Sequence, residues 1–207
     1  TLKYKDGDEP FIEFSSSNTH ELLVFTDQRQ VYKCKVAQFE DTKSAQLGSY
    51  LPTDLGMDPD ESVTWVIDPE DYKADVLFVF ENGRVARVAL AGYATKTNRK
   101  RLKNAIYGGS KLLFACVLKE DRDLALVSSD QRLINFNTSL LKTKTTNSTQ
   151  GVLAFTAKNG RIVTMVGTAE EFLGGTASVE KFRAASLPSS GSPMKETDMK
   201  SLFDLEE

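Results

Sequence analysis

An 18-residue pattern recurs along this 207-residue chain and constrains its fold more than any other feature. Each copy has an apolar run, a short polar turn and a second apolar run, which is typical of a β-hairpin. The copies are LLVFTDQRQVYKCKVAQF at residues 22–39, VLFVFENGRVARVALAGY at 76–93, LALVSSDQRLINFNTSLL at 124–141, and a fourth that begins LAFTAKNGRIVTM at 153. Starts that lie 54, 48 and 29 residues apart indicate repeats that pack against their neighbours.

Short apolar stretches on either side of each hairpin complete a unit of four strands. The candidates before the hairpins are residues 11–14, 62–67 and 112–117, and those after them are 47–51, 104–107 and 151–155. Four strands in roughly 50 residues match one blade of a propeller. We count three complete units and a closing strand around residues 161–166, because the fourth hairpin reuses the last strand of the third unit. The sequence therefore predicts an all-β, propeller-like fold of about three to four four-stranded blades.

Turn residues and segments outside the repeat complete this picture. Asn82-Gly83 and Asn159-Gly160 predict two-residue turns in which both central residues adopt φ > 0, whereas Asp27-Gln28 and Asp130-Gln131 need a different turn. The acidic insert at residues 51–61 is interpreted as a surface loop. The repeat is lost after residue 175, and the end of the chain is rich in Ser, Pro and acidic residues. We therefore expect one domain over residues 1–172 and a linker with a flexible acidic tail over 173–207.

Enzyme chemistry has little support in the sequence. His20 is the single histidine and lies in a polar stretch, so no Ser-His-Asp set can be assembled around it. The chain has no Cys/His pair at metal-ligand spacing and no glycine-rich phosphate-binding motif. We expect no catalytic residue, no metal and no cofactor.

The compartment is inferred from the apolar runs and the cysteines. The longest apolar runs, such as residues 112–118, are far shorter than the ~20 residues that span a membrane, so no membrane partner is expected. Cys34 and Cys116 are each placed in a strand and are expected to be free thiols, which favours the cytoplasm. The chain begins at Thr1, and we expect it to be part of a longer protein.

Charge is distributed unevenly along the chain. Residues 90–145 hold 11 Lys and Arg against 4 Asp and Glu, a net of +7, although the whole chain carries −3. Residues 1–89 carry a net of −8 and residues 146–207 a net of −2. Because a polyanion responds to local potential, one third of the chain is a candidate for binding nucleic acid.

The strongest functional candidate is the basic stretch ATKTNRKRLKN at residues 94–104, which follows the second hairpin. Lysines also occur at the corresponding place after the third and first hairpins, and equivalent positions of successive repeats lie on one edge of the assembly. Few aromatic residues interleave with these charges, so we expect contacts to the backbone of duplex DNA. The main candidates are Lys96, Arg99, Lys100, Arg101, Lys103, Lys142 and Lys144, and the secondary ones are Lys43, Lys33, Lys35, Arg84 and Arg87. A solvated run of charge is the alternative reading of the basic stretch alone.

Three stretches carry a family resemblance: the hairpin LLVFTDQRQVYKCKVAQF, the loop TKSAQLGSYLP and the later NSTQGVLAF. Together with the opening LKYKDGDEPFIEF, they resemble the C-terminal domain of the A subunit of bacterial type IIA topoisomerases, the DNA gyrase and topoisomerase IV group. The resemblance covers about residues 2–172. It implies a β-pinwheel, a disc whose blades exchange strands and whose basic rim bends or wraps duplex DNA. It also implies that the partners are duplex DNA, the other domains of the A subunit, and an ATPase B subunit reached through those domains.

Two features depart from the gyrase pattern. Gyrase-type domains carry a Q-R-R-G-G-x-G box, whereas the nearest stretch here, residues 98–101, keeps the charge and lacks the glycine pair. This absence favours a topoisomerase IV-like role over strong wrapping. Three repeats and a remnant are also fewer than the five or six blades common in such domains, so an open crescent is the alternative to a closed disc.

The resemblance implies a noncatalytic, DNA-bending accessory domain, because the DNA-cleaving tyrosine of such enzymes belongs to another domain. Neutralising Arg99, Lys100 and Arg101 should then weaken duplex binding and flatten its salt dependence. A separate hypothesis is that the acidic tail competes with DNA for the basic stretch. The rival function is a propeller-like scaffold that binds protein, and the acidic first third of the chain is its support.

Overall fold

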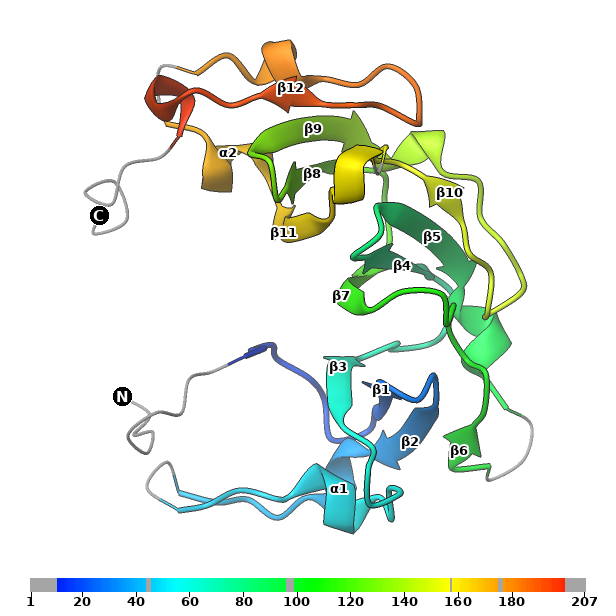
Figure 1. Ribbon diagram of the computed structural model, residues 1–207. Helices are drawn as coiled ribbons and strands as arrows, with labels where there is room; N and C mark the ends of the chain where they lie inside the picture. Colours follow the sequence, from blue (N-terminus) through cyan, green and yellow to red (C-terminus); the bar gives the residue numbers. More distant parts are fainter. Residues whose placement is uncertain (1–10, 44–45, 96–98, 157, 175–176, 200–207) are drawn as a thin grey trace.

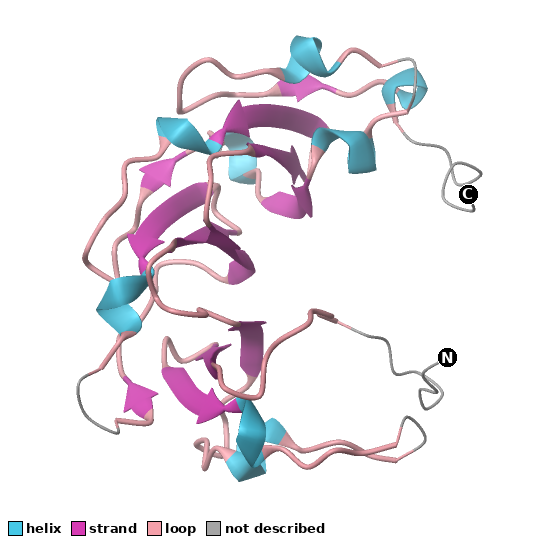
Figure 2. Cartoon of the chain, turned by 180° about the vertical axis from the view of Figure 1, so that it is seen from behind, coloured by secondary structure: helices cyan, strands magenta, loops and turns pink. Residues whose placement is uncertain are grey.

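The computed structural model describes residues 11–43, 46–95, 99–156, 158–174 and 177–199. Within these ranges, three four-stranded antiparallel sheets follow one another around an open crescent (Figure 1). The all-β, propeller-like prediction is confirmed, and the sheets do not close into a ring. Figure 2 shows the same three sheets and the same open side of the crescent from behind.

The first three sequence repeats form the central hairpins of the three sheets. These hairpins are β1 and β2 (Glu21–Thr26, Val31–Lys35), β4 and β5 (Asp75–Phe80, Arg84–Ala89), and β8 and β9 (Asp123–Ser128, Arg132–Asn137). Each is followed by a 3₁₀ turn: η1 (Val36–Gln38), η2 (Leu90–Tyr93) and η3 (Thr138–Leu140). Runs of mostly apolar residues form these strands because both faces of each hairpin are covered by neighbouring segments.

All three hairpins use the same turn, which differs from the two-residue turn expected at Asn82-Gly83. The third loop residue has positive φ in each case: 60° at Arg29, 80° at Gly83 and 56° at Gln131. Its amide donates to the last residue of the preceding strand, as Gly83 does to the carbonyl of Phe80. This is the three-residue loop that ends in a left-handed residue, and it pairs Val79 with Val85.

Two further strands complete each sheet, and they come from different places than the sequence predicted. The inner strands are β3 (Val63–Ile67), β7 (Leu112–Leu118) and β11 (Val163–Gly167); each pairs with the hairpin that precedes it in the chain. The outer strands are β6 (Arg101–Leu102), β10 (Val152–Leu153) and β12 (Ser192–Pro193). Residues 62–67 and 112–117 therefore belong to the unit before the one to which they were assigned.

The outer strands show that neighbouring blades exchange strands. The chain leaves the second hairpin and returns to the first sheet, where β6 pairs with β2. In the same way, β10 follows the third hairpin and pairs with β5. The fourth predicted hairpin is therefore wrong: its first half is β10 of the second sheet, Asn159 and Gly160 lie in η4 (Lys158–Gly160), and its second half is β11 of the third sheet. Residues 11–14, 47–51 and 104–107 are not strands.

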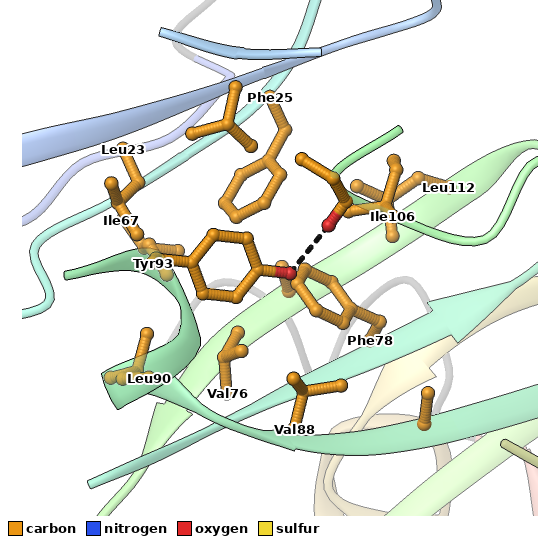
Figure 3. Packing of buried hydrophobic residues seen from close by; sticks show 14 of the residues in the cluster. Leu23, Phe25, Ile67, Val76, Phe78, Val88, Leu90, Tyr93, Ile106 and Leu112 are labelled. Carbon is orange, nitrogen blue, oxygen red and sulfur yellow. Dashed lines mark hydrogen bonds between the residues drawn. The ribbon is translucent and has the colours of Figure 1, made fainter. Parts of the chain in front are cut away.

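Apolar side chains fill the space between successive sheets. The first interface holds Phe25 and Phe78, whose rings lie 5.2 Å apart, and Tyr93 (Figure 3). The Tyr93 hydroxyl donates to the carbonyl of Ala105 at 2.7 Å and so ties the exchanged segment to the core. Phe136 and Phe155 are central to the second interface.

The two outward faces of the crescent are covered by segments that lie outside the sequence repeat. The insert at 51–61 contains α1 (Leu51–Asp54), and its Leu51, Leu55 and Met57 pack against Val24 and Tyr32. The insert thus lies at the surface, as predicted, and also covers apolar side chains of the first sheet. At the other end lie α2 (Ala169–Phe172), η5 (Val179–Phe182), β12 and η6 (Glu196–Asp198).

Residues 177–199, which the sequence places in a linker and tail beyond residue 172, pack on the third sheet. Phe182 and Met194 are buried against the third sheet, and β12 forms the edge of that sheet beside β9. Covering this face requires few apolar residues, and they are widely spaced, which explains why the sequence pattern did not reveal them. Two acids of the predicted tail, Glu196 and Asp198, lie in η6, and Asp198 pairs with Lys181. The last eight residues, 200–207, lie outside the described part, and competition of the tail with DNA stays a prediction.

Candidate DNA-binding edge

The candidate site is the convex edge of the crescent, along which the outer strands β6, β10 and β12 lie (Figure 1). The exchanged segments form this edge because each crosses from its own blade to the preceding one. The segment at 94–107 contains five Lys and Arg residues and no acid, and the one at 141–155 contains two and no acid. Two consecutive blades therefore have positively charged outer segments.

The first exchanged segment carries exposed cations on both sides of β6. Arg99 and Lys100 precede the strand and Lys103 follows it, and all three are exposed. Within the described chain they form no ion pair, which leaves their charge available to an anion. Lys96 lies outside the described residues.

Arg101 differs from its neighbours because its side chain is engaged inside the domain. Its guanidinium forms an ion pair with Asp58, bonds to the side chain of Gln30 and lies 5.3 Å from the ring centre of Tyr32. Hydrogen bonding to Asp58 raises the pKa of Arg101. The structure therefore separates Arg101 from the exposed cations with which the sequence grouped it.

The second exchanged segment presents Lys142 and Lys144, both exposed. Its backbone is fixed to β5, since the amide of Lys144 donates to Arg87 and the carbonyl of Lys144 accepts from Ala89, both at 2.9 Å. Lys43 and Lys35 are also exposed, the former in the loop after η1 and the latter at the end of β2. Arg84 is half-buried at the start of β5, opposite Leu153.

Two of the secondary candidates, Lys33 and Arg87, are committed to internal ion pairs. Lys33 is 9% exposed, and its Nζ lies 3.3 Å from the carboxylate of Glu21 and 5.1 Å from the ring centre of Tyr72. Arg87 bonds to Asp75 at 2.6 Å and to Asp121 at 2.7 Å. Burial lowers the pKa of Arg87, but these two carboxylates outweigh it and the net shift is upward. Both residues stabilise their own sheets.

The third blade has a balanced outer surface. Residues 177–199 contain three basic and three acidic residues. Lys181 pairs with Asp198 at 2.6 Å, and Arg183 bridges Asp123 and Glu180 at 3.0 and 3.1 Å. The excess of positive charge on the outer segments therefore falls from the first blade to the third.

A Ser-His-Asp grouping does occur, and its geometry is structural. Ser16 Oγ donates to Asp68 Oδ2 at 2.5 Å, and His20 Nδ1 lies 2.8 Å from the same oxygen. In a catalytic triad the histidine lies between the nucleophile and the carboxylate, whereas here the carboxylate lies between the other two. Burial raises the pKa of Asp68, but the bonds from Ser16 and His20 outweigh it, so the net shift is downward.

The described residues contain neither a cluster of metal ligands nor a membrane-spanning helix. Among the described residues, no three His, Cys, Asp or Glu side chains are grouped closely enough to hold a metal ion. The helices of the described ranges are all too short or too polar to cross a membrane. Cys34 and Cys116 are free thiols, and burial raises the pKa of Cys34 to about 11.

Comparison with known structures identifies the fold. The chain matches a crystal structure of the C-terminal domain of DNA topoisomerase IV with a TM-score of 0.74 and 19% identity, over 96% of this chain and 67% of that one. It matches a DNA gyrase A C-terminal domain with a TM-score of 0.61 and 15% identity, over 96% of this chain and 69% of that one. The match to the C-terminal domain of E. coli ParC has a TM-score of 0.68 and 13% identity, and covers 95% of this chain and 85% of that one.

Sequence comparison gives distant matches to the same class of protein. The A subunit of DNA gyrase from Mycolicibacterium smegmatis is 25% identical over 133 residues, which are 63% of this chain and 16% of the relative. The A subunit of DNA topoisomerase 4 from Staphylococcus aureus (strain MRSA252) is 23% identical over 141 residues, 66% of this chain and 18% of the relative. The chain thus spans less than a fifth of these relatives. No protein-family model matches it. The resemblance to these C-terminal domains is confirmed, and with it the pinwheel fold.

Proposed function

We propose that this chain is a noncatalytic accessory domain of a type IIA topoisomerase A subunit that binds and bends duplex DNA along its convex edge. The observation that carries the proposal is the row of exposed cations on the two exchanged segments: Arg99, Lys100 and Lys103 on the first blade, and Lys142 and Lys144 on the second. Point charges on a curved edge suit a phosphate backbone and carry no base recognition, so binding is expected to be largely independent of sequence.

The parent enzyme would act on DNA in the cytoplasm. The other domains of its A subunit, together with an ATPase B subunit, would perform cleavage and strand passage, and this domain would present the DNA. The lack of a Q-R-R-G-G-x-G box supports a topoisomerase IV-like parent. A short basic edge that spans two blades favours a modest bend over wrapping.

The test is titration of a fluorescent duplex with the domain between 50 and 200 mM salt. Each phosphate contact contributes a slope of about −0.9, so each costs roughly 3–4-fold in affinity across this range. Replacing Arg99, Lys100 and Lys103 by Ala should lower the slope by up to about 2.7. The matched control replaces Lys73, Lys119 and Lys195, three exposed lysines away from β6 and β10. Equal loss in both variants would show that net charge, and not this edge, drives binding.

Bending is measured separately by energy transfer between dyes at the two ends of the duplex. A protein-dependent rise in transfer that the edge variant abolishes is expected. Absence of binding at 50 mM salt would overturn the proposal and leave the protein-binding scaffold as the function. That alternative has a structural basis in the groove between β3 and β7, where Trp65 and Phe114 lie beside the half-exposed Phe14.

A further inference from the structure

The basic segment of the first blade is held to the domain by very little backbone. Strand β6 contributes two residues to the ladder, with Arg101 opposite Tyr32 and Leu102 opposite Val31. Two main-chain bonds extend it: the amide of Lys33 donates to the carbonyl of Lys100, and the amide of Ala105 donates to the carbonyl of Arg29, both at 2.8 Å. A two-residue strand at a sheet edge is weakly held, so side chains must contribute to fixing it.

The side chain of Arg101 provides such a fixed point. Nη1 donates to Oδ1 of Asp58 at 3.3 Å, Nη2 pairs with Oδ2 of the same carboxylate, and Nε bonds to the amide oxygen of Gln30. A planar guanidinium that uses its fork on one carboxylate is fixed in direction as well as in position. Hydrogen bonding from Arg101 lowers the pKa of Asp58, so the acid stays charged at neutral pH.

A second acid, Glu61, fixes the groups that surround Arg101. Its side chain is buried and accepts from the Tyr32 hydroxyl at 2.7 Å, from Gln30 Nε2 at 2.9 Å and from Thr26 Oγ1. Burial, with the bond to Glu61 as the next cause, raises the pKa of Tyr32 to about 12, so its hydroxyl remains a donor. Asp58 and Glu61 both come from the acidic insert, while Thr26, Gln30 and Tyr32 belong to the first hairpin.

We propose that Asp58 and Glu61 are positioning residues for DNA binding: the acidic insert locks β6 in place and thereby presents Arg99, Lys100 and Lys103 at the edge. This inference rests on the proposed function. By charge alone, an acid beside a basic edge should weaken the binding of a polyanion, so its removal should strengthen that binding. If the acid acts through position, its removal weakens DNA binding.

The decisive comparison is Asp58→Asn against Asp60→Asn in the DNA titration. Both variants remove one negative charge from the insert, but Asp60 is exposed and forms no hydrogen bond or ion pair within the described ranges. We expect Asp58→Asn to bind duplex several-fold more weakly than the wild type, and Asp60→Asn to bind equally or slightly more tightly. Asp58→Glu, which keeps the charge, should restore most of the affinity. Asp58→Asn binding as tightly as Asp60→Asn would overturn the inference.

The variant Arg101→Lys distinguishes a role of Arg101 in fixing β6 from a direct contact of its side chain with phosphate. Lysine keeps the charge and loses the fork, so a direct phosphate contact would survive the change whereas the clamp on Asp58 would not. We expect affinity to fall as in Asp58→Asn, and the double variant to fall no further than either single one. Unchanged affinity would contradict the positioning role.

Hydrogen exchange tests, without DNA, whether Asp58 holds β6 in place. The amides of Lys33 and Ala105 form the two main-chain bonds that join the first hairpin to the exchanged segment beyond β6. They should exchange about tenfold faster in Asp58→Asn, because loss of a charge-assisted hydrogen bond changes an opening equilibrium by about that factor. The amide of Val85, opposite Val79 in the second sheet, serves as the internal control. Unchanged protection at Lys33 and Ala105 would refute the lock. Faster exchange in a domain that binds no DNA would refute the proposed function alone.

Discussion

Replacing Tyr93 by Phe tests whether the exchanged segment is fastened to the core by one buried hydrogen bond. Tyr93 is fully buried between the first two sheets, and its hydroxyl donates to the carbonyl of Ala105, which is also buried (Figure 3). Burial raises the pKa of Tyr93 far above its usual value, so the hydroxyl is a donor at every accessible pH. Phe keeps the ring contacts with Phe25 and Phe78 and removes only this bond.

The loss of stability in Tyr93→Phe comes from the carbonyl of Ala105, which is left without a hydrogen-bond donor. A buried carbonyl without a donor costs about 1–3 kcal/mol. For a chain of this size, 1 kcal/mol shifts Tm by about 2–4 °C, so the expected decrease lies between about 2 and 12 °C. Urea unfolding should show a lower midpoint at an unchanged m-value, because the surface that unfolding exposes is the same.

Tyr107→Phe is the matched control for this prediction. Tyr107 lies on the same exchanged segment, its ring packs against Phe80 at 5.2 Å, and its hydroxyl makes no hydrogen bond to the described part of the chain. We expect this variant to unfold within about 0.5 kcal/mol of the wild type. An equal loss in both variants, or a loss below that value in Tyr93→Phe, would refute the role given to the bond.

Two further predictions concern the third blade. Phe182→Ala should lower the free energy of unfolding in urea by about 3–5 kcal/mol, because it opens a cavity under η5. The control Phe11→Ala, at a side chain 72% exposed, should lower it by less than about 0.5 kcal/mol. Similar losses in both variants would mean that residues 177–199 do not cover this face. The ion pair of Asp130 with Arg161, at 2.7 Å, lowers the pKa of Asp130 below 3.8, so its stabilisation is present above that pH and is lost as the pH falls through the folded-state value. Asp130→Asn should therefore be less stable than the wild type at pH 7 and equal to it in strong acid, and a stability difference that does not change with pH would exclude this ion pair as the cause.

The hairpins could be predicted from the sequence because strand periodicity and the repeat gave the same answer. The sequence did not predict which strands the flanking strands pair with. β6 and β10 have two residues each, too few for a periodic signal, and which sheet they join depends on the spatial order of the blades. The turns also set the register: a two-residue turn at Asn82-Gly83 would place Val79 opposite Ala86, one position from the pair observed.

The candidate site was predicted in part for similar reasons. Exposed lysines after a hairpin are visible as a run of charge, and the structure places Arg99, Lys100, Lys142 and Lys144 on the outer segments. The internal ion pairs of Lys33 and Arg87 were missed because their acids, Glu21 and Asp75, lie on the neighbouring strand of the hairpin. Asp58 and Glu61 were missed because an acidic Pro/Gly stretch has the composition of a solvated loop.

The exchange of strands also governs the order in which the nascent chain can fold. β2 has no outer partner until residue 102 has left the ribosome, by which time the second hairpin has already emerged. β5 in turn waits for residue 153, beyond the third hairpin. Neither of the first two blades can finish before the hairpin of the next blade is available, so synthesis produces overlapping, incomplete sheets and not a series of finished units. Ribosome stalling between residues 89 and 101 would therefore leave the edge of β2 open to pairing with another chain.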